Sequence, residues 1–298
     1  AGGDITTARF CTAVGRQALR QNTTTEYLTA VGYSAMRSTT GVKNTAVGNS
    51  ALYTNAAGAE NTAVGDNALY ANTTGEKNTA VGSGALDSVT DGYGNTALGF
   101  NAAAGLVSNT ARHNVAIGRE ALAVQDRSED NVAVGYDAMG NCNNASNSQN
   151  TAVGSNALPA SGLAGYGNAA FGYNAGQAVT SGLHNVLIGR QAGNNITTGD
   201  ENICMGYLAR PDGVAGTGQV VIAYNLPGKG NSTGLFGGAS GVYNEGNTTA
   251  WQTTSDERIK KNITNNKIGL DAINKIQIRN FEYRTEDEIT ELPKESVI

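Results

Sequence analysis

The chain has few charged, aromatic, proline and cysteine residues. Only 15% of its 298 residues are charged and 6% are aromatic, and it contains four prolines and three cysteines. This composition is unlike that of a typical enzyme core. The formal charge of −5 comes without any block of Lys and Arg. Because nucleic acids and anionic membranes bind concentrated positive surface, we expect neither as a partner.

Long apolar runs are absent as well. No stretch approaches the roughly 20 apolar residues needed to span a bilayer, and the opening AGGDITTARF lacks the basic and apolar regions of a signal peptide. We therefore expect no membrane insertion. Cys11, Cys142 and Cys204 are odd in number and far apart, which argues against a disulfide framework and fits a reducing site of synthesis. Cys204 stands where most repeats have alanine, so we interpret it as a small filler.

Glycine, in contrast, is abundant: there are 40, and many belong to a repeat of the form NTAVGxxAL. Twelve copies follow one another at spacings of 16 to 19 residues, most often 17. Their glycines are Gly15, Gly32, Gly48, Gly65, Gly82, Gly99, Gly118, Gly135, Gly154, Gly172, Gly189 and Gly206. The period is too short for a helix-turn-helix unit, and the segments alternate as strands do. The sequence therefore predicts an all-β fold, a parallel β-solenoid or β-roll with coils of about 17 residues.

The residues around each glycine occupy fixed positions. Residues one and three before it, such as Val47 and Thr45, share one face of a strand, and we expect that face to line the core of the coil. Alanine stands between them in ten of the twelve copies, and again three residues after the glycine in all twelve. Since a solvated face would vary more and a thin coil buries little surface alone, the alanines predict contacts with neighbouring subunits in a parallel homo-oligomer.

Asparagine precedes the glycine by four residues in ten consecutive copies, from Asn44 to Asn202. Stacked at about 4.8 Å per coil, these side chains can form an amide ladder, with their backbones in the turn conformation that Asn tolerates. The residue just before the asparagine is usually polar or charged, and both histidines, His113 and His184, fall there. We interpret them as solvated turn residues, and we predict no metal site and no cofactor.

Aromatic residues recur at two further positions, directly after the glycine and just beyond the Ala-Leu pair. The tyrosines concerned are Tyr33, Tyr53, Tyr70, Tyr136, Tyr173 and Tyr207. Two interpretations stay open: the rings stack between successive coils, or their faces bind sugar rings of a host surface glycan. These six tyrosines are the candidate binding residues.

The motif NTAVGxxAL, with variants such as HNVAIG at 113–118, resembles the head repeats of YadA-like trimeric adhesins and repeats of phage tail fibres. The resemblance covers about residues 10–209, although the period is longer than in the adhesin. It implies a homotrimer of left-handed parallel β-rolls. We therefore expect a solenoid shaft over residues 1–209, followed by a glycine-rich β neck over residues 210–254.

Residues 255–298 change abruptly to a charged composition. Leu270, Ile273 and Ile276 form one apolar stripe of a short helix, and a strand is expected around IRNFEYR. The opening TTSDERIKKNI at 253–263, the helix GLDAINKI and the FEYR strand resemble the self-cleaving intramolecular chaperone domain, of endosialidase type, at the C-terminus of phage tail spikes and fibres. The segment is shorter than that domain usually is, so we expect a truncated α+β beginning of it.

In that family the domain trimerises, templates the fibre ahead of it and is released by cleavage before a serine. The resemblance implies a scissile bond between Thr254 and Ser255, with Ser255 as nucleophile and Lys260 as general base. A partly desolvated lysine can activate a serine in this way. Alternatively, Ser255 and Asp256 cap a helix, and both roles can hold together. Apart from this single-turnover autoproteolysis, we expect no enzymatic activity.

These features predict a structural, receptor-binding tail fibre or spike of a phage, made in the host cytoplasm and mounted on the virion. Its partners would be further copies of the chain in a homotrimer, other virion tail proteins, and a glycan or outer-membrane receptor on the host cell surface. A bacterial trimeric adhesin and a polysaccharide-depolymerising tail spike stay open as alternatives. The second needs two carboxylates at a fixed separation, whereas the acids here scatter over turns.

Overall fold

A computed structural model describes residues 7–106, 111–124, 129–142, 148–160, 164–238, 242–244 and 251–253. The chain separates into two units, residues 1–254 and 255–298, and the second unit lies outside the described residues. The described residues contain strands and turns but no helix. The strands are β1 (Thr12–Val14), β2 (Thr29–Val31), β3 (Thr45–Val47), β4 (Thr62–Val64), β5 (Thr79–Val81), β6 (Thr96–Leu98), β7 (Val115–Ile117), β8 (Val132–Val134), β9 (Thr151–Val153), β10 (Ala169–Phe171), β11 (Val186–Ile188), β12 (Ile203–Met205), β13 (Val220–Ala223), β14 (Gly234–Gly237), β15 (Val242–Asn244) and β16 (Trp251–Thr253).

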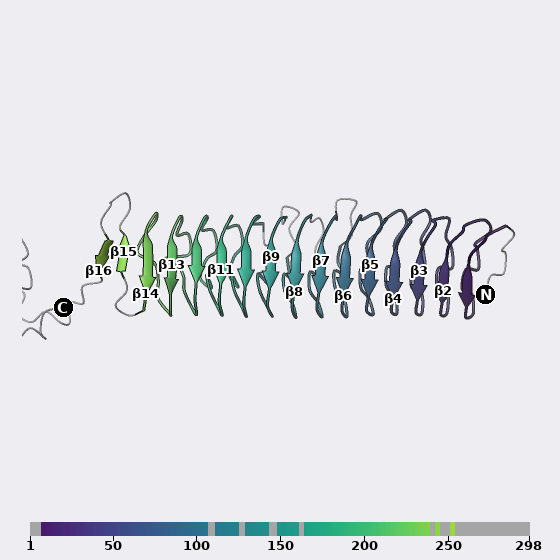
Figure 1. Ribbon diagram of the computed structural model, residues 1–298, viewed down its shortest axis with the longest axis horizontal. Coiled ribbons are helices and arrows are strands. Elements are labelled where there is room, and N and C mark those ends of the chain that lie inside the picture. Colours follow the sequence, from purple (N-terminus) through teal and green to yellow (C-terminus); the bar gives the residue numbers. More distant parts are fainter. Residues whose placement is uncertain are drawn as a thin grey trace, which may run out of the picture. The chain divides into compact units, whose positions relative to one another are not determined.

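The strands form one sheet in sequence order. From β1 to β14 each strand pairs in parallel with the next, and equivalent residues of successive repeats lie opposite one another, as Ala46 does with Ala63. The order is antiparallel only at β14–β15–β16. Figure 1 shows the strands stacked side by side along one axis. The predicted parallel β-solenoid with a period of about 17 residues is therefore confirmed.

A glycine follows each of the strands β1 to β12 because no other residue fits there. These glycines have φ between 116° and 141°, a region that side chains disfavour. At Gly118, with φ 132°, an added Cβ would lie 2.4 Å from the carbonyl oxygen of Gly135 in the next coil. Both the backbone conformation and the close approach of the coils therefore require glycine at the end of the strand.

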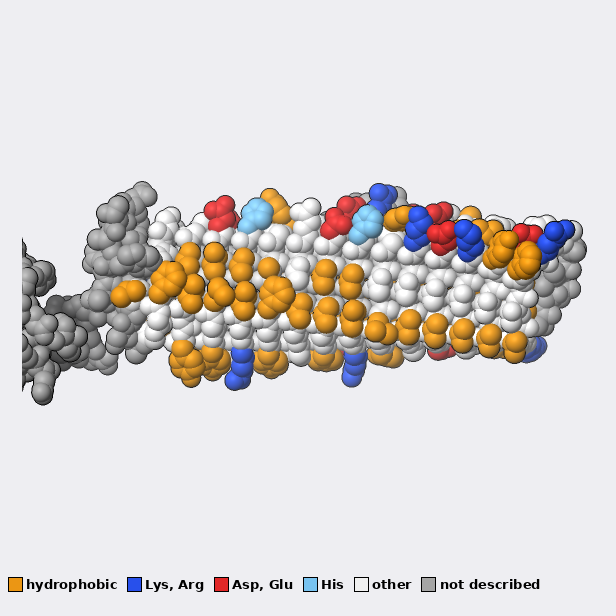
Figure 2. All heavy atoms as spheres, in the orientation of Figure 1, with side chains coloured by type: hydrophobic (Ala, Val, Ile, Leu, Met, Phe, Trp, Pro, Cys, Tyr) orange, Lys and Arg blue, Asp and Glu red, His pale blue; other side chains and the backbone are white. Residues whose placement is uncertain are grey.

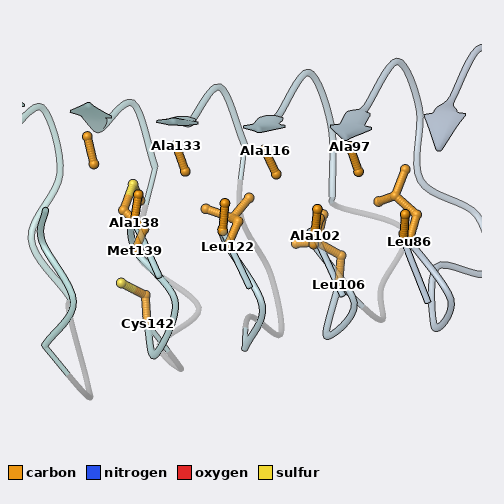
Figure 3. Close-up of a cluster of buried hydrophobic side chains, with 14 of the residues drawn as sticks. Leu86, Ala97, Ala102, Leu106, Ala116, Leu122, Ala133, Ala138, Met139 and Cys142 are labelled. Carbon is orange, nitrogen blue, oxygen red and sulfur yellow. The ribbon is translucent and has the colours of Figure 1, made fainter. Parts of the chain in front are cut away.

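The core of each coil is lined by alanine and leucine. The strand alanines from Ala30 onward, such as Ala97, and most of the alanines and leucines that follow the glycine, such as Ala102 and Leu122, are fully buried. In Figure 3, Ala97, Ala116 and Ala133 point from the strands into the coil, toward the opposite wall that carries the leucines. The prediction that the valine and threonine face lines the core is wrong, because those side chains point outward. The prediction that the alanines contact neighbouring subunits is also wrong, because they are buried within their own coil.

The narrow space between strand and opposite wall explains why the strand presents alanine. Where β11 carries Leu187 instead, the residues of the opposite wall at the usual leucine position are Gly176 and Gly193. An added Cβ at Gly193 would lie 2.5 Å from Leu187 Cδ2, and one at Gly176 would lie 2.8 Å from Leu187 Cδ1. A large side chain on one wall is thus offset by a small one on the other, as close packing requires.

The predicted amide ladder is present and fully buried. The backbone N–H of Asn95 donates to Oδ1 of Asn78 at 3.0 Å, and its Nδ2 donates to the same oxygen at 3.1 Å and to the carbonyl of Ala111 at 2.9 Å. Asn114 repeats this pattern onto Oδ1 of Asn95. We expected the asparagine itself to adopt the turn conformation. The residue with left-handed φ is instead the one before it, such as Lys77 with φ 57°. The ladder satisfies the turn's polar groups inside the coil.

Candidate functional site

The outward face of the sheet is a continuous, largely apolar surface. Its main column consists of the residues that precede the glycine of each coil and their equivalents in β13 and β14. They are Val14, Val31, Val47, Val64, Val81, Leu98, Ile117, Val134, Val153, Phe171, Ile188, Met205, Ile222 and Phe236. Several are more than a third exposed, including Leu98 at 47% and Phe171 at 40%. Figure 2 looks onto this face, and the hydrophobic side chains run along its whole length.

The outward face has a second column, formed by the first residue of each strand. The residue type in this column differs between the two halves of the solenoid. It is threonine from β1 to β6, and then mostly aliphatic: Val115, Val132, Val186, Ile203 and Val220. In Figure 2 the band of hydrophobic side chains widens accordingly from the N-terminal half to the C-terminal half. No charged residue interrupts either column. The outward face is therefore most apolar toward the C-terminal end of the solenoid.

Such a face is unusual for a parallel sheet. Parallel sheets are normally covered on both faces, whereas here only the alanine side is covered, by the rest of each coil. Thirteen steps of about 4.8 Å make the outward face about 60 Å long. Contiguous apolar surface of this extent on a monomer typically marks a site of association. The arrangement is suited to bury one flat sheet face against another.

One group of charged side chains lies away from this face, at the turn that precedes the asparagine ladder. Lys43 Nζ lies 3.1 Å from Glu60 Oε1, and His113 Nδ1 lies 3.3 Å from Asp130 Oδ1. His113 and His184 are both exposed, and each ring meets a tyrosine ring edge to face. The structure thus places both histidines at solvated turns. Among the described residues, no group of three His, Cys, Asp or Glu side chains could hold a metal ion.

A shallow depression of about 450 Å³ lies at the same turns. It is lined by Thr74, Glu76, Asp91, Tyr93, Arg112 and His113. The side chains of three successive coils contribute to it, and isolated bridges join Glu76 to Tyr93 and Tyr93 to Arg112. The depression combines two carboxylates with the guanidinium of Arg112 and the imidazole of His113, so acidic and basic groups are mixed in it. It does not present the single dominant charge that would select a ligand.

No family model, curated protein or solved structure matches the chain. The site is therefore interpreted from its own geometry. In the part of the chain that the structure describes, no helix has the length and apolar character needed to cross a membrane.

The structure divides the six candidate tyrosines between two edges of the solenoid. Tyr53 and Tyr70, five residues after their glycines, stack with ring centroids 5.2 Å apart and planes inclined by 10°. The guanidinium of Arg37 lies over the ring of Tyr53 at 5.6 Å. For this pair the interpretation as ring stacking between successive coils is therefore confirmed.

The other four tyrosines lie directly after their glycines, in a single column beside the outward face. This column, called the aromatic edge below, contains Arg16, Tyr33, Phe100, Arg119, Tyr136, Ser155, Tyr173, Arg190, Tyr207 and Tyr224 among its members. Here most rings contact arginine rather than another ring. Arg16 lies over Tyr33 at 5.8 Å and Arg119 over Tyr136 at 5.6 Å, and only Tyr207 and Tyr224 contact each other, at 5.3 Å.

Sequence reasoning based on aromatic type missed the arginines of this edge. Arg16, Arg119 and Arg190 follow their glycines by one residue, as the tyrosines do. Tyr224 follows Ala223, which takes the place of the glycine in the coil of β13. All four residues share one offset from the end of the strand, and this offset is the sequence signal that identifies them.

The predicted cleavage residues Thr254, Ser255 and Lys260 lie outside the described residues.

Proposed function

We propose that the chain forms the shaft of a homotrimeric phage tail fibre or spike that reaches and binds the surface of a host cell. The observation that carries the proposal is the uncovered outward face of the parallel sheet. Three copies packed through this face would cover it and leave the aromatic edge and the charged turns for contact with the host. The resemblance of the repeat to those of trimeric adhesins and tail fibres supplies the number of copies.

Self-association would use the outward face of the sheet and not the alanines. The alanines that suggested subunit contacts are inside the coil, whereas Leu98, Ile117 and Phe171 are outside it and exposed. Burial of apolar surface stabilises an assembly by about 25 cal/mol per Å². Burial of a face about 60 Å long therefore strongly favours assembly. A rigid rod of coils also suits attachment, since it holds a receptor-binding surface at a fixed distance from its anchor.

Sedimentation velocity of the 30.5 kDa chain tests this proposal. We expect a trimer for the unaltered chain and dissociation for Leu98→Lys, because three lysines would be buried together at the interface. Val124→Lys is the matched control: Val124 is also 47% exposed but does not lie on the outward face. A monomeric unaltered chain, or a Leu98→Lys variant that stays trimeric, would contradict the proposal.

The C-terminal unit, residues 255–298, is proposed to be the beginning of an assembly chaperone that is cut from the shaft between Thr254 and Ser255. Identical repeats allow chains to pair one coil out of register, so a template at one end would favour the correct alignment. Intact-mass measurement of the expressed chain tests this role. A fragment that begins at Ser255 and disappears in Ser255→Ala supports it, and an uncut chain argues against cleavage.

A further inference from the structure

We propose that the aromatic edge around Arg190 binds an acidic polysaccharide, one whose sugars carry carboxylate groups. This inference deepens the proposed attachment function and rests on it for its biological setting. The proposed ligand is an anion, and Arg190 is the residue that binds its charge. The site consists of Tyr173, Arg190, Tyr207 and Tyr224, which follow one another on four successive coils.

Arg190 lies between two tyrosine rings. Its guanidinium carbon is 5.8 Å from the ring centroid of Tyr173 and 5.5 Å from that of Tyr207, and Tyr207 in turn contacts Tyr224. Arg190 is exposed. Rings on both sides hold the planar guanidinium in one orientation, so less conformational entropy is lost when it binds an anion. The edge thus presents a pre-positioned cation to solvent.

The same edge contains a second arginine whose charge is already neutralised. Arg119 lies between Phe100 and Tyr136 at 5.9 and 5.6 Å, as Arg190 lies between its two rings. However, Arg119 Nη2 donates to Glu120 Oε1 at 3.0 Å, and this contact raises the pKa of Arg119. Within the described residues no carboxylate forms an ion pair with Arg190, and the residue that follows it is Gln191. The two sites therefore match in shape and differ in charge.

The row of rings also has room for a sugar. Beyond Tyr173 the aromatic edge continues with the short side chain of Ser155. That side of the Tyr173 ring has no aromatic or cationic contact among the described residues, and the ring is 47% exposed. The apolar face of a pyranose can pack on such a ring, while the guanidinium donates two parallel hydrogen bonds to a carboxylate.

The ligand is a polymer because the site extends along the rod over several coils. Tyr173, Arg190, Tyr207 and Tyr224 span three coil steps, about 14 Å in all, which is several sugar units of an extended chain. The guanidinium N–H groups of Arg190 and the tyrosine hydroxyls on either side of it lie along this line and would contact successive sugars. In the trimer three such rows would act together, so weak single contacts give useful overall affinity.

Binding of fluorescently labelled oligogalacturonate to the 298-residue protein, measured by anisotropy, tests the proposal. We expect binding to the unaltered protein and a loss of about tenfold or more in Arg190→Gln, since a hydrogen-bonded ion pair is removed. Arg119→Gln is the matched control and should bind as the unaltered protein does. Carboxyl-reduced oligogalacturonate should bind at least tenfold more weakly, since it has no carboxylate to accept hydrogen bonds from Arg190.

Absence of binding, equal losses in the two arginine variants, or equal binding of the carboxyl-reduced ligand would each overturn the proposal. These outcomes are independent of the test of the fibre itself. Sedimentation reports whether the chain assembles through its outward face, and it does so whatever the glycan result. A trimer that ignores oligogalacturonate would therefore refute the acidic ligand while leaving the proposed shaft in place.

Discussion

At the scale of single residues, the inner side of the coil is closely packed. Cys204 shows how a reactive side chain behaves there. It takes the place that alanine has in ten of the twelve copies, and it is completely buried on β12. Burial raises the pKa of its thiol to about 12, from 9.0 for an unburied thiol. The thiol therefore stays protonated at neutral pH and serves as a filler, as the sequence predicts.

This shifted pKa makes the stability of the solenoid depend on alkaline pH. Between pH 9 and about 12 the folded state keeps the Cys204 proton that the unfolded state releases, so the free energy of unfolding falls as pH rises. The slope is about 1.4 kcal/mol per pH unit at most. Urea unfolding at pH 7.5 and 10.5 should show a smaller loss of stability in Cys204→Ala than in the unaltered chain. Equal losses would contradict the prediction.

At the scale of the element, the strand and its glycine were predictable, because they follow from period and alternation. The amide ladder was predictable for the same reason: a polar residue at a fixed offset must meet its own copies in the neighbouring coils. The face of the strand that points into the coil was not predictable. In Thr-Ala-Val the alternation groups Thr45 with Val47, but it does not say whether that pair or the alanine faces inward.

The residues of the opposite wall determine which face of the strand points inward, and these residues lie outside the strand. Leucine already fills the space there in most coils, so only a methyl group fits on the strand. The sequence did contain a signal: where Leu187 replaces the strand alanine, Gly176 and Gly193 replace the leucine of the opposite wall. The arginines of the aromatic edge were missed for a related reason. Residue type drew attention to the tyrosines, whereas position along the coil determines which side chains stand together.

At the scale of the whole molecule, the described coils form a one-dimensional stack in which each coil pairs with its two neighbours. Successive strands from β1 to β14 pair only with the strand before and the strand after. Stability should then be nearly a sum over coils and their interfaces. A rod of this kind can lose whole coils without losing its fold, provided that the cut keeps equivalent residues opposite one another.

Removal of residues 44–94 tests this property. The segment runs from Asn44 to the residue before Asn95, which is three coils, so Asn95 takes the place of Asn44 in the amide ladder. We expect a folded rod that is about 14 Å shorter, as measured by small-angle scattering, with a β-type circular dichroism spectrum. Removal of residues 44–85 deletes about two and a half coils and is the control. It would place side chains of the turn opposite a strand at the new junction, so we expect a lower free energy of unfolding than after the removal of three whole coils. If both shortened chains were equally stable, alignment of equivalent residues would not be what holds the solenoid together, and the outward face would lose the regular column on which the proposed trimer depends.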